Sequence, residues 1–270
     1  MDYCTVQGET VPAVGLGTAR MTASECERAV EQALELGYRH IDTAQVYDTE
    51  DAVGLAVATS ALDREEVFLT TKLHRTNLRR GDVFRSVEES LDRLETDYVD
   101  LLLIHEPNRE VPVEETLGAM NDLQEEGLVR HVGVSNFPVR GMQAAADASR
   151  TPIFTNQIEY NPVRGQEDVL RWCLDHDVLV TAYSPLDVGR VVYDGTLRDI
   201  GSRYDKTAAQ VALRWLIQQD NVVAIPKAVR RDYLAENVDL FDFELTTAEM
   251  ERIFDIGDGL STRTRSLLNL

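Results

Sequence analysis

Four titratable side chains of different kinds lie at or just after the ends of short apolar segments in the first part of the chain. They are Asp42, Tyr47, Lys72 and His105. A phenol is a poor acid near pH 7 because its reference pKa is about 10, but a neighbouring lysine cation favours the phenolate and lowers that pKa. An aspartate paired with the lysine makes burial of the lysine tolerable, and a histidine can orient a polar substrate or share the proton. Together the four groups could protonate an alkoxide as it forms, which is the chemistry that reduction of a carbonyl group requires.

Each of these residues also has an ordinary structural interpretation. Asp42 could cap the helix that follows it, Tyr47 could be a core residue, and His105 could be a hydrogen-bonded histidine at the end of an apolar strand. Lys72 is harder to explain in this way, because the sequence contains only two other lysines, Lys206 and Lys227. A catalytic interpretation therefore depends on a fold that brings all four side chains to one place.

The hydrophobic pattern predicts strands and helices that alternate along the whole chain. The expected strands are residues 14–17, 40–42, 67–72, 99–105, 131–135, 153–157, 178–183 and 222–225. The expected helices include residues 24–36, 81–94, 113–126, 167–175 and 207–218. Ser24 is expected to cap the first of these helices, with Glu27 completing a capping box, and Gly37 and Gly127 are expected to end helices.

Eight strand signals, each followed by a helical signal, favour a closed (β/α)8 TIM barrel in the α/β class over an open sheet. Residues 3–6 and 10–11, joined by a turn at 7–9, are expected to form a short β-hairpin that closes the N-terminal end, or bottom, of the barrel. A doubly wound sheet is the alternative, but its G-x-G-x-x-G turn is missing, since Arg20 stands where the third glycine would be. No linker rich in proline, glycine or serine interrupts the chain, so residues 1–270 are expected to form a single domain.

A barrel would explain how the four side chains meet. The C-terminal ends of its strands open on one mouth, where catalysis takes place. Asp42, Lys72 and His105 come at the ends of three successive expected strands, and Tyr47 lies in the loop after the first of these. The sequence therefore predicts one active site at this mouth.

The overall charge limits the classes of partner. The sequence has 47 Asp and Glu against 27 Lys and Arg, and its formal net charge is −20. Nucleic acids and anionic membranes need cationic surfaces and are therefore not expected as partners. An acidic, lysine-poor composition is typical of halophilic proteins, whose charge is screened by a salty cytoplasm, although an ordinary acidic bacterial enzyme is the alternative.

Other sequence features favour a reduced, intracellular protein. The N-terminus lacks the basic and apolar regions of a secretory signal, so the protein is expected to be cytoplasmic. Cys4, Cys26 and Cys173 are odd in number and widely spaced, which predicts half-buried thiols rather than disulfides. The five histidines lack metal-ligand spacing, so no metal site is expected and a metal-dependent barrel hydrolase is disfavoured.

In several motifs the chain resembles the aldo-keto reductases, and closely the prokaryotic branch that includes 2,5-diketogluconate reductases. These motifs occur in family order over nearly the whole chain: GYRHIDTAQVY at 37–47, FLTTKL at 68–73, LLIH at 102–105, VGVSNF at 132–137, AYSPL at 182–186 and IPK at 225–227. The resemblance implies a (β/α)8 fold and NAD(P)H-dependent reduction of aldehydes or ketones to alcohols by hydride transfer. It implies that Tyr47 is the general acid, that Lys72 and Asp42 tune it, and that His105 orients the substrate.

The resemblance also implies a cofactor site made of scattered strand-end residues. Ser135, Asn136 and Gln157 would bind the nicotinamide amide, and Tyr183 would stack on the nicotinamide ring. The structural alternatives are turn formation for Asn136 and Gln157 and core packing for Tyr183. Lys227 and the helix start near Asp232 would bind phosphate. The other implied cofactor residues are Gly17, Thr18, Ser184, Leu186, Ala228, Arg230, Arg231, Glu236 and Asn237.

Two departures from the family pattern concern the cofactor. Ala228 stands where serine is common and Tyr233 where arginine is common, and both usual residues help to hold the 2′-phosphate of NADPH. Arg230 or Arg231 could replace them. The sequence therefore predicts relaxed cofactor use, with NADP(H) favoured and NAD(H) also accepted.

Further departures concern the substrate pocket. His74 and Glu106 stand where many relatives have tryptophan, which predicts a polar wall suited to small or hydroxylated carbonyl compounds, unless Glu106 merely faces solvent. The chain ends soon after Leu260, which predicts a shallow, open pocket and broad specificity. A monomer or weak dimer is expected. A regulatory subunit that only binds the cofactor is the main non-enzymatic alternative, and it would need a partner surface that no motif marks.

Overall fold

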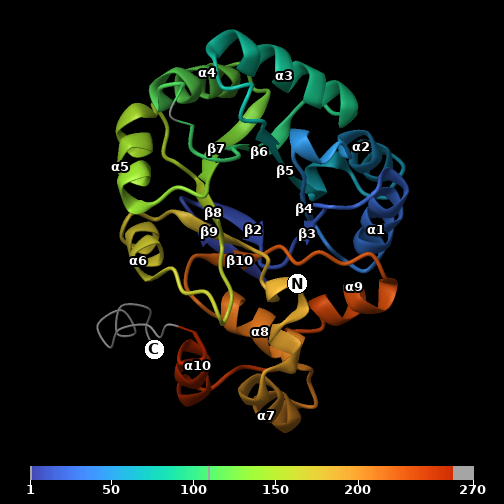
Figure 1. Ribbon diagram of the computed structural model, residues 1–270. Coiled ribbons are helices and arrows are strands. Elements are labelled where there is room, and N and C mark those ends of the chain that lie inside the picture. Colours follow the sequence, from blue (N-terminus) through green and yellow to red (C-terminus); the bar gives the residue numbers. More distant parts are fainter. Residues whose placement is uncertain (1, 109, 258–270) are drawn as a thin grey trace.

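The computed structural model describes residues 2–108 and 110–257, and within these ranges its central feature is a parallel sheet of eight strands (Figure 1). Each strand pairs with its neighbours in chain order from β3 to β10. The strands are β3 (Leu16–Gly17), β4 (His40–Asp42), β5 (Phe68–Leu73), β6 (Val99–Ile104), β7 (Val129–Ser135), β8 (Thr155–Glu159), β9 (Leu179–Tyr183) and β10 (Val222–Ala224).

The sheet closes into a barrel between its first and last strands. Val14 forms a parallel bridge with Ala224, and the amide of Gly15 donates to the Ala224 carbonyl at 2.9 Å. A Cβ atom at Gly17 would lie 2.9 Å from the carbonyl oxygen of Ile225, so glycine is needed for this close approach. The (β/α)8 barrel predicted from the sequence is therefore confirmed.

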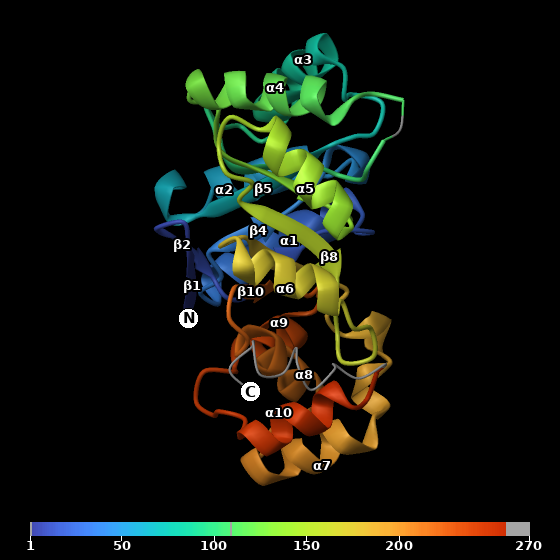
Figure 2. The same ribbon diagram turned by 90° about the vertical axis from the view of Figure 1, so that its left-hand side faces the viewer.

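Helices surround the strands on the outside of the barrel (Figure 1). They are α1 (Ala23–Glu35), α2 (Glu50–Ala58), α3 (Arg80–Arg93), α4 (Val113–Glu125), α5 (Val139–Ala148), α6 (Glu167–Asp175), α7 (Gly195–Tyr204), α8 (Ala208–Ile217), α9 (Arg231–Val238) and α10 (Thr247–Phe254). Short 3-10 turns add η1 (Gln45–Tyr47), η2 (Arg64–Glu66), η3 (Asp187–Gly189) and η4 (Val191–Tyr193). Figure 2 shows that α7 and α10 lie together beyond α8, at one side of the barrel.

An antiparallel hairpin closes the bottom of the barrel, as the sequence predicts. Its strands are β1 (Tyr3–Val6) and β2 (Glu9–Pro12). Val6 and Val11 pack into a buried apolar cluster with Leu101 and Leu103 of β6 and with Phe154, which directly precedes β8. Burial of these side chains attaches the hairpin to the sheet.

The residues predicted to begin and end the helices are only partly correct. Gly37 follows α1 and Gly127 follows α4. The two glycines have φ angles of 95° and 79°, which confirms the predicted C-terminal ends of these helices. The capping box is formed by Thr22 and Glu25, however, and not by Ser24 and Glu27. The two S/T-x-x-E patterns overlap in sequence, and the one nearer the N-terminus is used because the helix begins at Ala23.

The cysteines are free, but two of them are fully buried rather than half-buried. Cys26 and Cys173 lie in the core, and only Cys4 is partly exposed. Burial raises the pKa of the Cys26 thiol to about 11, so this side chain is an apolar core group at neutral pH. Among the residues that the structure describes, no helix is long and apolar enough to cross a membrane.

Candidate active site

The C-terminal ends of β4 and β5 bring Asp42 and Lys72 into contact. In the parallel register Asp42 lies opposite Thr70, and Lys72, two residues further along β5, points to the same face of the sheet. The Lys72 ammonium Nζ lies 2.5 Å from Asp42 Oδ1 and donates to the Thr43 carbonyl oxygen at 2.7 Å. The Lys72 side chain is fully buried. Its burial is tolerable because a carboxylate and a carbonyl replace water around the charge.

The electrostatics of this pair keep Lys72 positively charged. Burial alone would lower the pKa of Lys72, but the charge of Asp42 and the nearby Tyr47 oxygen, together with hydrogen bonds to both, raise it. The second oxygen of the Asp42 carboxylate accepts a hydrogen bond of 2.7 Å from Gln157 Nε2. Asp42 is therefore held on both oxygens, and the ammonium is held by Asp42.

Tyr47 and His105 complete the group of four predicted catalytic residues, named here the tetrad. The Lys72 ammonium lies 5.0 Å from the centre of the Tyr47 ring. The ring of Tyr47 meets the ring of His105 edge to face, with 5.7 Å between the centroids. Burial, followed by the positive charge of Lys72, lowers the pKa of His105 to about 4, so its imidazole is neutral at pH 7. The structure thus brings all four side chains of the tetrad together.

The predicted amide-binding residues form a second polar group, connected to the tetrad by Gln157. Tyr183 donates its hydroxyl to Asn136 Oδ1 at 2.9 Å, and Asn136 Nδ2 donates to Ser135 Oγ at 3.0 Å. Asn136 has a φ of 62°, a left-handed conformation that asparagine tolerates. The Gln157 side chain donates to Asp42, a contact that the sequence did not predict.

The donor set fits a nicotinamide cofactor. Amide and hydroxyl groups of Asn136, Ser135 and Gln157 match the donors and acceptors of a carboxamide, and the half-buried ring of Tyr183 offers a stacking face. The buried hydroxyl of Thr43, beside Asp42, has no hydrogen-bond partner among the described residues. A polar ligand at this mouth would supply such a partner.

The predicted cations after β10 are already engaged by other groups of the protein. Lys227 is exposed and donates to the Arg20 carbonyl at 3.0 Å. The Arg230 guanidinium pairs with the Asp232 carboxylate and lies over the Tyr233 ring, 4.6 Å from its centre. The remaining arginine, Arg231, pairs with Glu35 at 2.6 Å. These carboxylates partly neutralise both arginines.

The other predicted cofactor residues have mixed environments. Thr18 donates its amide and hydroxyl to the Asp42 carbonyl, each at 3.0 Å, so it supports the end of β4. Ser184 has a φ of 48° and accepts from Asn161 Nδ2 at 3.1 Å through its carbonyl. Leu186 is partly buried against the core, Ala228 and Asn237 are buried, and Glu236 accepts from the Thr207 hydroxyl at 2.6 Å.

The predicted substrate-wall residues differ in exposure. His74 is half-buried, and its ring nitrogen Nδ1 lies 2.7 Å from the Thr76 hydroxyl. Glu106 is half exposed and lies 3.8 Å from Arg75 in an ion pair. The chain end on which the prediction of an open pocket depends lies outside the described residues. Within the described ranges, no group of three or more His, Cys, Asp or Glu is arranged to hold a metal ion.

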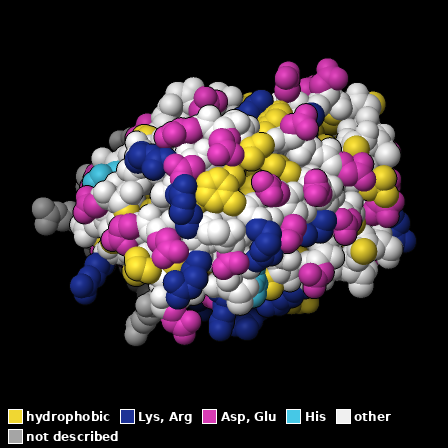
Figure 3. Space-filling model, turned by 90° about the horizontal axis from the view of Figure 1, so that it is seen from above, with side chains coloured by type: hydrophobic (Ala, Val, Ile, Leu, Met, Phe, Trp, Pro, Cys, Tyr) yellow, Lys and Arg dark blue, Asp and Glu magenta, His cyan; other side chains and the backbone are white. Residues whose placement is uncertain are grey.

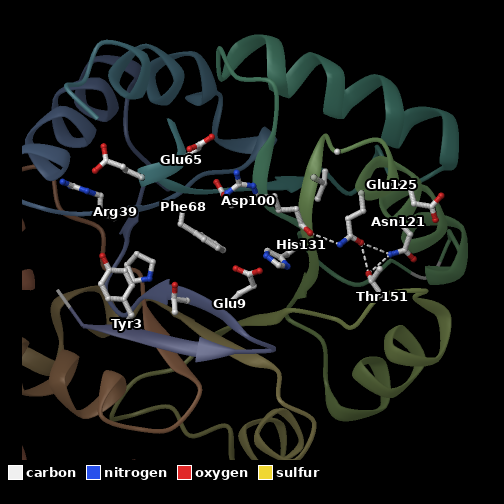
Figure 4. A pocket seen from close by; sticks show the side chains of 17 residues that line it. Tyr3, Glu9, Arg39, Glu65, Phe68, Asp100, Asn121, Glu125, His131 and Thr151 are labelled. Carbon is white, nitrogen blue, oxygen red and sulfur yellow. Dashed lines mark hydrogen bonds and ion pairs between the residues drawn. The ribbon is translucent and has the colours of Figure 1, made fainter. Parts of the chain in front are cut away.

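Another hollow lies at the other end of the barrel from the tetrad. It has a volume of about 880 Å³ and is lined by Tyr3 and Glu9 of the hairpin together with Phe68 and His131 (Figure 4). Phe68 begins β5, whereas Lys72 lies near the end of that strand. The tetrad is absent from the described lining of this hollow, so its size says nothing about the candidate active site.

Comparisons with known proteins agree with this fold and site. A model of the aldo/keto reductase family matches residues 13–258. Methylglyoxal reductase DkgB of Escherichia coli O157:H7 is 41% identical over 246 residues, which cover 90% of this chain and 92% of that protein. A crystal structure provisionally named 2,5-diketo-D-gluconic acid reductase B has a TM-score of 0.93 and 45% identity, covering 95% of this chain and 92% of the other. A Bombyx mori aldo-keto reductase solved in complex with NADP has a TM-score of 0.89 and 36% identity, covering 96% and 94%. The chain therefore belongs to the aldo/keto reductase family and is an NAD(P)H-dependent oxidoreductase.

Proposed function

We propose that this protein reduces small, polar aldehydes and ketones to alcohols, with Tyr47 as the proton donor. The observation that carries this proposal is the buried Lys72 ammonium, which is held by Asp42 and faces the Tyr47 ring. Bound NAD(P)H supplies the hydride in this reaction. The remaining requirement is a proton for the carbonyl oxygen, and the tetrad has the residue types that can provide it.

Each residue of the tetrad has a distinct part in the proposed proton transfer. The Tyr47 hydroxyl donates its proton to the carbonyl oxygen of the substrate as that oxygen gains negative charge. The Lys72 ammonium stabilises the phenolate that remains, and Asp42 fixes the ammonium in place. His105 is neutral, so it can donate a hydrogen bond to the same carbonyl oxygen and orient it. Tyr47 is half-buried, so water can return a proton to it after each turnover.

The test of this proposal is oxidation of reduced nicotinamide, followed by absorbance, with a panel of carbonyl compounds in high salt. The relatives named for methylglyoxal and 2,5-diketogluconate suggest small, oxygen-rich substrates, and the polar side chains of His74 and Glu106 agree with this class. Failure of every aldehyde and ketone to oxidise either coenzyme would overturn the proposal.

For the cofactor, we propose that Ser135, Asn136, Gln157 and Tyr183 bind the nicotinamide end and that Lys227 and the start of α9 bind phosphate. The other residues proposed for cofactor binding are Gly17, Thr18, Ser184, Leu186, Ala228, Arg230, Arg231, Glu236 and Asn237. Because Asp232 and Glu35 partly neutralise the two arginines, recognition of a 2′-phosphate is expected to be weak.

Relaxed cofactor use can be measured directly. Hydrogen bonds to charged groups contribute about 1.5–3 kcal/mol each. The absence of the serine and the arginine that are usual at positions 228 and 233 therefore lowers discrimination between NADPH and NADH by roughly a thousandfold. The ratio of kcat/KM for NADPH to that for NADH is therefore expected to lie well below about a thousand. Both coenzymes must be compared at the same salt concentration, since salt screens the phosphate. A larger ratio would contradict weak recognition of the 2′-phosphate.

We also propose a cytoplasmic, salt-adapted protein that forms one domain and exists as a monomer or weak dimer. The free thiols of Cys4, Cys26 and Cys173 support a reducing compartment. Figure 3 shows Asp and Glu side chains spread over one whole face, with Lys and Arg between them. With a net charge of −20, repulsion between these carboxylates is expected to destabilise the fold when salt is low.

Salt dependence of stability tests this adaptation. Raising KCl from about 0.1 M to 1 M shortens the Debye length from about 10 Å to 3 Å, and we expect Tm to rise by at least about 5 °C. Sucrose of equal osmolality is the control, because it is uncharged and cannot screen. A Tm that responds equally to KCl and sucrose, or to neither, would contradict salt adaptation.

A further inference from the structure

Tyr47 lies in a turn whose backbone alone holds it weakly. The turn η1 contains only three residues, and the residue before it, Ala44, supplies no side-chain cap. The following residue, Asp48, has a left-handed φ of 53°, and Val46 is 46% exposed. A single short turn at the surface does not by itself fix the direction of a tyrosine side chain.

Packing beneath the turn is also incomplete. A hollow of about 420 Å³ lies among η1, α2, α3 and the loop after β5. Its lining consists of Gln45, Val46, Asp48, Asp51, His74, Asn77, Ser86, Glu89 and Arg93. Apart from Val46 these residues are polar or charged, so apolar packing across this space contributes little to fixing the position of the turn.

The Gln45 side chain reaches from the turn to these facing elements and makes four hydrogen bonds. Its Nε2 donates to the Ser86 carbonyl and to Ser90 Oγ, each at 3.1 Å, on α3. Its Oε1 accepts from the His74 amide at 2.8 Å and from Asn77 Nδ2 at 3.0 Å. His74 is two residues beyond Lys72, so Gln45 ties the turn with Tyr47 to the strand with Lys72.

Glu50 makes a similar connection on the other side of Tyr47. Its buried carboxylate accepts from Thr71 Oγ1 at 2.6 Å, and Thr71 directly precedes Lys72. The same carboxylate accepts from Arg93 Nη2 at 2.7 Å and from Ser90 Oγ at 3.3 Å on α3. Ser90 is thus shared by Gln45 and Glu50.

We propose that Gln45 and Glu50 are positioning residues for the proton donor, which they hold from both sides at a fixed place relative to Lys72. This inference rests on the proposed role of Tyr47. A displacement of a reacting group by about 1 Å can cost a hundredfold in rate, so hydrogen bonds that fix the turn should affect proton transfer directly.

The test replaces Gln45 by methionine, which keeps the length of the side chain and removes its hydrogen bonds. The control is Gln218→Met, because Gln218 is also half-buried and makes three side-chain hydrogen bonds, to Leu245 and Arg214, far from the tetrad in sequence. For each variant, kcat, the coenzyme Kd, Tm and the solvent deuterium isotope effect on single-turnover coenzyme oxidation are measured. Ser90→Ala is the second variant, since it removes the hydroxyl that both positioning residues share.

We expect Gln45→Met to lower kcat by about 10- to 100-fold, to raise the solvent isotope effect and to leave the coenzyme Kd within about twofold. Ser90→Ala should cause a smaller change in the same direction, and Gln218→Met should lower Tm without changing kcat. Wild-type kcat and isotope effect in Gln45→Met and Ser90→Ala would overturn the inference, as would an equal loss of kcat in Gln218→Met. Failure of the proposed function would look different, because the wild-type protein would then reduce no carbonyl compound.

Discussion

Replacing Tyr47 with phenylalanine is expected to lower kcat by about 10²–10⁴-fold, the usual contribution of a positioned general acid. The phenyl ring keeps the edge-to-face contact with His105, so the shape of the site is retained while the proton donor is lost. Because Tyr47 is proposed to act on the substrate, the coenzyme Kd should stay within about twofold of the wild-type value.

Steady-state kinetics and coenzyme titration of the same preparation check this result. Tyr98→Phe is the matched control, since Tyr98 lies between the guanidinium groups of Arg64 and Arg130, away from the tetrad. Its kcat should match that of the wild type. Near-normal turnover in Tyr47→Phe would mean that another group supplies the proton.

The second large effect concerns the buried pair of Asp42 and Lys72. Replacing Lys72 with methionine leaves a buried carboxylate whose remaining described hydrogen bond to a side chain comes from Gln157. Loss of one partner of a buried ion pair typically costs about 3–5 kcal/mol, so we expect the free energy of unfolding to fall by about 3 kcal/mol. Turnover should fall as well, because the cation that stabilises the phenolate is gone.

A double variant separates stability from catalysis. Asp42→Asn combined with Lys72→Met removes both charges and keeps an oxygen that can accept from Gln157. Its free energy of unfolding, measured with urea at constant high salt, is expected to recover at least half of the loss. Its kcat should remain as low as that of Lys72→Met. Recovery of activity along with stability would show that the ammonium has no part in the reaction.

Much of the fold could be predicted from the sequence because burial leaves a periodic pattern. The apolar runs at β6 and β9 identify strands that are covered on both faces, and the hairpin is expected from two short strand segments that flank a turn at residues 7–9. Element ends were harder to predict. Residues 153–157 were expected as a strand, but β8 begins at Thr155, because Ile153 and Phe154 are buried without belonging to it.

The centre of the site could be predicted because neighbouring strands are also neighbours in sequence. Asp42 ends β4 and Lys72 is the last but one residue of the adjacent strand β5, so the barrel alone brings them together. The bond between Gln157 and Asp42 spans 115 residues, and a glutamine in the middle of a strand such as β8 has the same local pattern whatever it contacts. The contacts of Glu50 could not be predicted either. An acidic residue in the first turn of a helix is common, so the position of Glu50 in α2 gives no sign that its partners lie on α3 and β5.

The structure also explains why cofactor preference could not be predicted from residue types alone. Arg230 and Arg231 are cations in the sequence, but each faces a carboxylate, Asp232 or Glu35, in the fold. Ion pairs of this kind depend on side-chain direction, which a list of residues does not contain. The preference therefore has to be measured rather than inferred from the number of arginines.

The central claim is that the ammonium of Lys72 and the hydroxyl of Tyr47 act together on the carbonyl oxygen of the substrate. A crystal structure of the protein with oxidised coenzyme and an unreactive carbonyl compound tests this most directly. We expect Tyr47 Oη to lie about 2.7 Å from the carbonyl oxygen and within about 3 Å of Lys72 Nζ, as hydrogen bonds require. A carbonyl oxygen bound elsewhere, with Tyr47 Oη out of contact with both groups, would contradict it.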